Sequence, residues 1–314
     1  MFICQSNLNH AELLRQYGEK KLQENLDIER ETRDTHAIYY AHTAEQIMTN
    51  QLIADEATVE LENLYAGWYW AVDSLNVKLL WKCVSTYGII TYQLNNHMEI
   101  RLLYDYALKS YPQLEHNHPY LFASLSYVSA SIHLYLMDRS KNQLLLEQGR
   151  EIFKNIDLST QSPEIVYAHY HYVLALRTTS YETCLIILDE IVSVLESLNS
   201  TDDDVWQTML IYAYSQQAYI HGVFASDYEN AKTVALKALS MAQHIQHKTL
   251  LALSAGILGH FELVLENHEQ ATYYFTTAEE AYQHLNSPFD YGYMLLYAGK
   301  NALVIQQYED AQHY

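Results

Sequence analysis

Small and large apolar residues recur at helical spacing along most of the chain, and short polar turns separate the apolar segments. The clearest unit covers residues 253–282, where a polar turn at 266–269 lies between two such segments. The residues that carry its pattern are Ala255, Leu258 and Gly259 before the turn and Ala271, Phe275 and Ala278 after it. Small residues allow two helices to cross closely, and large residues fill the space beside each crossing. This unit therefore predicts a pair of antiparallel helices.

The same pattern recurs about every forty residues, which indicates a repeat protein. The spacing matches the tetratricopeptide (TPR) repeat, with a small residue at position 8, alanine at 20, an aromatic residue at 24 and alanine at 27, although the standard interval is ~34 residues. The signature residues of the other copies are Gly88, Tyr104 and Ala107, then Ala231 and Ala238, and finally Gly299 and Ala311. We expect an all-α protein, a right-handed superhelical array of antiparallel helix pairs (a TPR-like α-solenoid), with about six repeats over residues 76–314.

The last of these copies is incomplete, because the chain ends at Tyr314, shortly after Ala311. An open half-repeat leaves an apolar face without a neighbour. We therefore expect that the polypeptide is part of a longer protein or that a partner covers this end.

Three helical segments precede the repeats, at about residues 10–23, 29–48 and 56–72. They contain, in this order, the strings Leu13–Leu22, Arg33–Tyr40 and Glu60–Ala71. These strings resemble the segment that joins the winged-helix part to the TPR part in bacterial signal-transduction ATPases of the NB-ARC type (the STAND class), including relatives of the AfsR and LuxR-like regulators. The resemblance runs from Leu13 to about Pro112. It implies that residues 1–75 are a helical connector, made of the end of a winged helix and the helices before the repeats.

The resemblance also implies a function, the sensor arm of a signalling ATPase or transcriptional regulator, with an NB-ARC module as a partner upstream. The resemblance does not imply that this chain hydrolyses ATP. The only Gly-Lys pair, Gly299-Lys300, is followed by Asn301 and has Met294 where the first glycine of a phosphate-binding loop would stand. DNA reading is not implied either, because the match begins at about the last element of the winged helix.

Charge and cysteine content narrow the range of partners. Lys and Arg number 18 against 38 Asp and Glu, so the net charge is −20 and the surface repels phosphate backbones and anionic lipids. We expect neither direct nucleic-acid binding nor membrane binding. The three cysteines are far apart in sequence and no signal peptide precedes them, which indicates a cytoplasmic protein.

A protein or peptide ligand in a concave groove is the expected partner. In TPR arrays the first helix of each pair lines this groove, a property that the repeat resemblance implies. The positions that we predict to line it are Tyr92, His169, Val173, Gln216, Ile220, His260, Leu263, Tyr293 and Lys300. Any one of them could instead belong to the core between repeats. The surface they form is largely apolar and aromatic, which suits an amphipathic helix or an extended peptide.

No residue pattern indicates catalysis, a cofactor or a metal. No nucleophile, base or phosphate loop has a recognisable spacing, and the 16 histidines form no group with three or four converging ligands. Most of the 29 tyrosines fit packing positions, but we expect Trp68, with Tyr65 and Tyr69, to form an exposed aromatic cluster. The sequence therefore predicts a non-catalytic binding module, and the alternative is a scaffold protein that bridges two protein partners.

Overall fold

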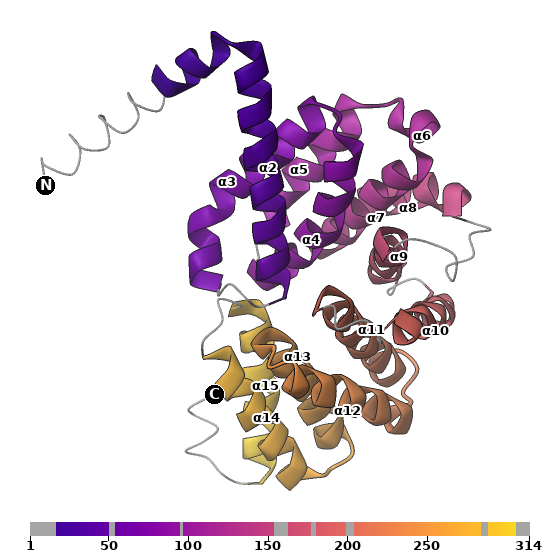
Figure 1. Ribbon diagram of the computed structural model, residues 1–314. Helices are drawn as coiled ribbons and strands as arrows, with labels where there is room; N and C mark the ends of the chain where they lie inside the picture. Colours follow the sequence, from indigo (N-terminus) through magenta and orange to yellow (C-terminus); the bar gives the residue numbers. More distant parts are fainter. Residues whose placement is uncertain are drawn as a thin grey trace, which may run out of the picture.

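The computed structural model describes residues 17–49, 54–94, 97–153, 163–176, 180–198, 204–283 and 288–305. Every regular element in these ranges is a helix (Figure 1). A helical stretch at residues 17–23 comes first. In chain order it is followed by α2 (Leu26–Met48), α3 (Ala54–Asp73), α4 (Val77–Leu94), α5 (His97–Ser110), α6 (Leu114–Asn117), α7 (Pro119–Tyr135), α8 (Arg139–Phe153), α9 (Pro163–Leu176), α10 (Tyr181–Leu198), α11 (Asp204–Val223), α12 (Tyr228–His244), α13 (Lys248–Val264), α14 (His268–Tyr282) and α15 (Pro288–Val304). The expected all-α fold is confirmed.

The helices pair as the repeat pattern predicts. The pairs are α4 with α5, α7 with α8, α9 with α10, α11 with α12 and α13 with α14, and α15 is the first helix of the next unit. The first helices of successive pairs lie side by side, from α7 through α9, α11 and α13 to α15. This stacking is that of a TPR-like α-solenoid, and Figure 1 shows it curving from the upper half of the molecule to the lower half.

Five turns between helices use the same left-handed backbone conformation, at a residue other than glycine. Five residues adopt a left-handed conformation two or three residues after the end of a helix, namely Leu75, Met137, Ser226, Gln246 and Glu266. Each is followed by Asn, Asp or His, and the backbone N–H of that next residue donates to a carbonyl of the preceding helix. In four of the five turns this carbonyl lies five residues back, as in a Schellman motif, and after Ser226 it lies six residues back. In four of the five turns the same residue caps the next helix or bonds within its turn: Asn76, Asp138, Asp227 and His247 accept from a backbone N–H three residues on.

The repeat-signature residues lie at the helix crossings. Tyr104, Ala107, Ala231, Ala238, Ala271, Phe275 and Ala278 are all buried. Gly259 faces the ring of Phe275, and a Cβ atom at position 259 would lie 2.6 Å from ring carbons. Gly299 is half-buried in α15, whereas the surroundings of Gly88 and the position of Ala311 fall outside the described part of the chain.

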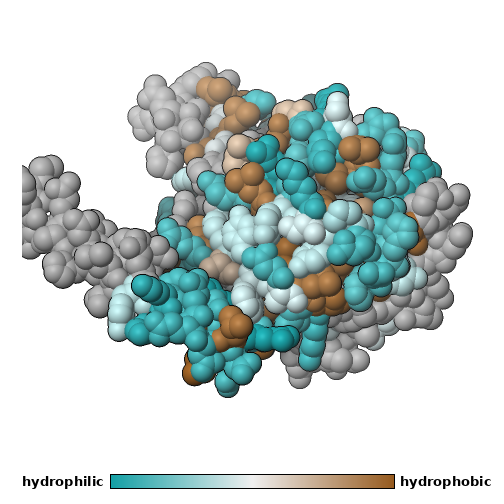
Figure 2. Space-filling view, turned by 90° about the horizontal axis from the view of Figure 1, so that it is seen from above, coloured by the Kyte–Doolittle hydropathy of each residue, from teal (hydrophilic) through white to brown (hydrophobic). Residues whose placement is uncertain are grey.

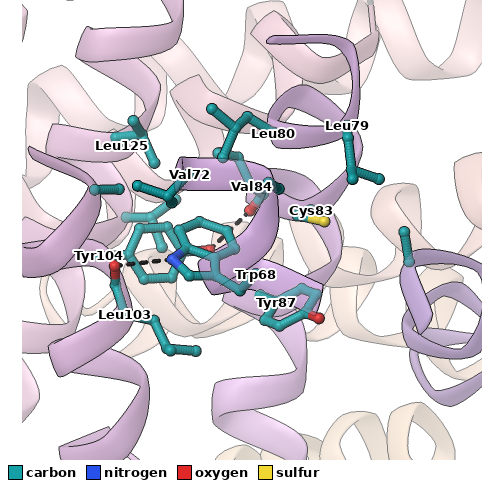
Figure 3. Close-up of a cluster of buried hydrophobic side chains, with 14 of the residues drawn as sticks. Trp68, Val72, Leu79, Leu80, Cys83, Val84, Tyr87, Leu103, Tyr104 and Leu125 are labelled. Carbon is teal, nitrogen blue, oxygen red and sulfur yellow. Dashed lines mark hydrogen bonds between the residues drawn. The ribbon is translucent and has the colours of Figure 1, made fainter. Parts of the chain in front are cut away.

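The helices before the repeats share a core with the first repeats. Side chains from α2, α3, α4, α5 and α7 form one hydrophobic cluster. At its centre the Trp68 indole lies between the rings of Tyr87 and Tyr104, with ring centroids 5.3 Å and 4.8 Å away (Figure 3). Its Nε1 donates a hydrogen bond to the carbonyl of Leu103 at 2.9 Å. The expectation that Trp68 is exposed is therefore wrong: the indole has a buried acceptor and fills a space between three helices, while Tyr69 remains partly exposed.

The end of helix α2 contacts the turn before α13 and so joins the N-terminal and C-terminal parts of the solenoid. The end of α2 reaches the C-terminal repeats, where Met48 joins the cluster formed by α9 to α13. The Nε2 of His247 donates to the Met48 carbonyl at 2.9 Å, and its Nδ1 accepts from Leu250 N at 3.3 Å. Both residues are about 1% exposed. This contact joins residues that are 199 positions apart and fixes α2 against the turn before α13.

No helix in the described ranges is long and apolar enough to cross a membrane. The face seen from above shows hydrophobic residues as small separate patches among hydrophilic ones (Figure 2).

Candidate partner-binding groove

The forty-residue interval places equivalent positions of α11, α13 and α15 on one face. The three rows are Gln216, Gly256 and Leu296, then Ile220, His260 and Lys300, then Val223, Leu263 and Leu303. Adjacent helices touch along this face: Ser215 and Ser254 hydroxyls are 3.4 Å apart, and the rings of His260 and Tyr297 have centroids 4.3 Å apart. The first helices α11, α13 and α15 therefore form a continuous wall.

The N-terminal end of this wall is closed. His169 and Val173 on α9 are 5% and 0% exposed, and Ile220 on α11 is 0% exposed. Helices α4 and α7 pack on α9 and bury its two positions, and Ile220 belongs to the core cluster formed by α9 to α13. These three predicted groove residues therefore lie in the core. The Nδ1 of His169 donates a hydrogen bond to the Ile165 carbonyl at 3.1 Å.

The C-terminal end of the wall is open. Leu296 and Leu303 on α15 are 54% and 56% exposed, and Lys300 between them is exposed. Gln216, His260 and Leu263 are half-buried. We call Gly256, His260, Leu263, Leu296, Lys300 and Leu303 the open groove face. The side chains of Tyr92 and Tyr293, which the sequence also predicts to line the groove, lie outside the described residues.

A histidine and a lysine set the electrostatics of the open groove face. Burial lowers the pKa of His260, and the positive charge of Lys300 lowers it further, so the imidazole is neutral near pH 7. The Lys300 ammonium lies 4.7 Å from the centre of the Tyr297 ring, a cation–π distance. The face thus offers apolar side chains, one neutral imidazole and one cation, which suits the apolar side chains of a peptide.

Polar side chains also cluster elsewhere in the described residues, at Asp105 and at the Ser131–His171 pair, whose Oγ and Nδ1 are 3.2 Å apart. No group of three His, Cys, Asp or Glu side chains there could hold a metal ion. Ser129 Oγ and His133 Nε2 both bond to the same carboxylate oxygen of Asp105, at 3.3 Å and 3.4 Å. Because both groups bond to the carboxylate, the link from nucleophile to base that a catalytic triad requires is not formed.

Sequence reasoning missed the closure of the groove. His247 was recognisable only as a histidine near a helix end, and no local pattern pairs it with Met48. The one available signal is its place directly before α13, where it caps the helix.

Comparisons with known proteins agree with the fold. No family model matches the chain, and no curated protein matches it in sequence. Among solved structures, the chain is similar to a Rap protein complexed with competence and sporulation factor, with 12% identity and a TM-score of 0.55 over 97% of this chain and 90% of that one. It is also similar to the apo form of RapI, with 13% identity and a TM-score of 0.50 over 95% of this chain and 77% of that one. At these identities the likeness shows a shared helical-repeat fold.

Proposed function

We propose that the chain is a non-catalytic module that binds a peptide or a protein segment on its open groove face. The observation that carries the proposal is the exposure of Leu296, Lys300 and Leu303 beside His260 on adjoining first helices. On α9 the equivalents of Leu296 and Lys300, His169 and Val173, are buried. Exposed leucines of this kind on a helical wall mark a site of interaction. The Rap protein of the same fold was crystallised with a bound factor, which supports a partner-binding role for this architecture.

The finer proposal is that the module regulates a bacterial signalling ATPase or transcriptional regulator. It rests on the three strings in residues 13–71 that resemble the connector of NB-ARC proteins. It predicts an NB-ARC reading frame directly upstream of this one. An isolated gene, or two unrelated proteins captured through opposite faces, favours the scaffold role instead.

Selection of peptides tests the binding role directly. A random peptide library is panned against the full chain, and the enriched peptide is synthesised with a fluorescent label for anisotropy titrations. Leu296→Glu and Lys300→Glu are the groove variants, because both side chains are exposed and their loss does not disturb the core.

Matched controls lie on the second helix α12. Leu236 is 40% exposed and Lys237 is exposed, so Leu236→Glu and Lys237→Glu make the same chemical changes outside the groove. We expect Leu296→Glu to weaken binding by about tenfold or more, as for a desolvated apolar contact, and the controls to stay within about twofold. Equal effects in both pairs, or failure of any peptide to enrich, would contradict the proposal.

A further inference from the structure

A second cleft lies between α8 and α9, away from the open groove face. Elsewhere in the solenoid the second helix of a pair packs closely on the first helix of the next pair, as α10 does on α11 and α12 on α13. Helix α8 makes far fewer contacts with α9. The space between them is a pocket of about 390 Å³ with Leu146 of α8 and Leu176 of α9 in its apolar part.

The polar lining of this pocket carries two arginines. Arg139 and Arg150 lie on the same face of α8, eleven residues apart, which is about 16 Å along the helix axis. Neither guanidinium forms an ion pair with a carboxylate among the described residues, although the chain as a whole carries a net charge of −20. Burial raises the pKa of Tyr172, which lines the same pocket, and the positive charge of Arg150 opposes that rise.

Between the arginines the cleft offers a buried amide. Asn142 is 5% exposed, and its Nδ2 donates to the carbonyls of Ala130 at 2.9 Å and Ala175 at 3.5 Å. These bonds use both amide protons, so Oδ1 is the group that Asn142 can offer to a ligand, as an acceptor. Glu147 lies on the same lining and receives a hydrogen bond from Gln143 Nε2 at 3.0 Å.

We propose that this cleft binds an extended acidic peptide segment, with one carboxylate at Arg139, another at Arg150 and a backbone N–H at Asn142 Oδ1. Arginine forms bidentate hydrogen bonds with carboxylates, so the two ends of the cleft select for charge and spacing together. An extended chain rises about 3.3 Å per residue, and residues four apart point to the same side. Two carboxylates at this spacing are about 13 Å apart, within reach of two flexible arginine side chains. The net negative charge of the protein acts weakly on the segment, because salt screens it beyond about 8 Å. This site does not depend on the function proposed for the open groove face.

A set of short labelled peptides tests the proposal on the full chain. The probe is an alanine and valine pentapeptide with aspartate at its first and fifth positions and blocked ends. One comparison peptide carries asparagine at both positions, and another carries aspartates at the first and second positions. Binding is measured by fluorescence anisotropy at two salt concentrations. We expect the first peptide to bind about tenfold or more tightly than either comparison peptide and to weaken as salt rises.

Four variants assign the effect to the cleft. Arg139→Gln and Arg150→Gln should each weaken binding of the probe by about tenfold, because each removes a charged hydrogen bond. Glu147→Gln should strengthen it, a gain that a purely structural role would not produce. Lys237→Gln, an exposed cation on the second helix α12, should leave binding within about twofold. All four positions are exposed, so far-UV circular dichroism should be unchanged.

Two results would overturn the proposal. The first is that the peptide with spaced aspartates binds no more tightly than its asparagine counterpart. The second is that Lys237→Gln weakens binding as much as the two cleft arginine variants, because binding would then reflect general attraction to cations. Loss of binding in the arginine variants together with a gain in Glu147→Gln supports it.

Discussion

Gly259→Ala tests whether α13 and α14 cross as closely as the repeat pattern requires. A Cβ atom at this position would lie 2.6 Å from Cδ1 and Cε1 of Phe275, whose side chain is 1% exposed. Overpacking of this kind costs about 1–3 kcal/mol, and the higher helix propensity of alanine returns about 1 kcal/mol. We expect a net loss of up to about 2 kcal/mol in the free energy of unfolding, measured by urea titration with far-UV circular dichroism.

Gly256 on the same helix provides the matched control. The nearest atom to a Cβ there is Met294 Cγ at 3.8 Å, an ordinary contact. Gly256→Ala should therefore stabilise the protein by about 0.5–1 kcal/mol through helix propensity alone. In a Phe275→Leu background the cost of Gly259→Ala should largely disappear. If Gly259→Ala stabilises the protein as Gly256→Ala does, or if its cost persists with leucine at 275, the close crossing is not the cause.

Three other stability predictions follow from buried or strained groups. Burial lowers the pKa of His171 to about 3 and that of His169 to about 4, whereas an unfolded histidine titrates near 6.5. Below pH 6.5 the unfolded chain therefore binds protons that the native chain does not, so the free energy of unfolding should fall between pH 6.5 and 4, by about 3 kcal/mol per histidine. The variant His171→Asn should lose less stability over this range. The same pH profile in the variant and the original protein would contradict the role of His171. The Glu262 carboxylate is 1% exposed and lies 2.6 Å from the Lys232 ammonium. Lys232→Met leaves this buried carboxylate without its cation and should lower the free energy of unfolding, measured in urea, by about 2–3 kcal/mol. An unchanged free energy of unfolding would show that the pair is not needed for stability. Met137 is 81% exposed and has a φ of 60°, a conformation that glycine adopts without strain. Met137→Gly should therefore stabilise the protein by about 0.5–1 kcal/mol. A loss of stability would argue against the left-handed conformation at this turn.

The helix pairs could be predicted because their signal is local. Alanine, glycine and aromatic residues at fixed spacing indicate which faces of two neighbouring helices pack together. Residues such as Ala271 and Phe275 therefore identify a repeat from one short stretch of sequence. The polar turns are local in the same sense, since Asp227 and its neighbours satisfy the ends of α11 and α12.

The closure of the groove could not be predicted, because it depends on contacts between distant segments. The carbonyl of Met48 and the imidazole of His247 meet only after the solenoid has curved through several repeats. Packing between helices likewise buries His169, Val173 and Ile220, which have groove positions in the repeat but core positions in the protein. Trp68 was misjudged for a related reason, since its partners Tyr87 and Leu103 lie on other helices.

Hydrogen exchange measured by mass spectrometry tests most directly where a partner binds. The full chain is compared with and without the peptide selected from the library. We expect slower exchange in α13 and α15, the helices that carry the open groove face, and unchanged exchange in α12. Protection confined to α2 through α5, or no change in α13 and α15 at saturating peptide, would contradict the account.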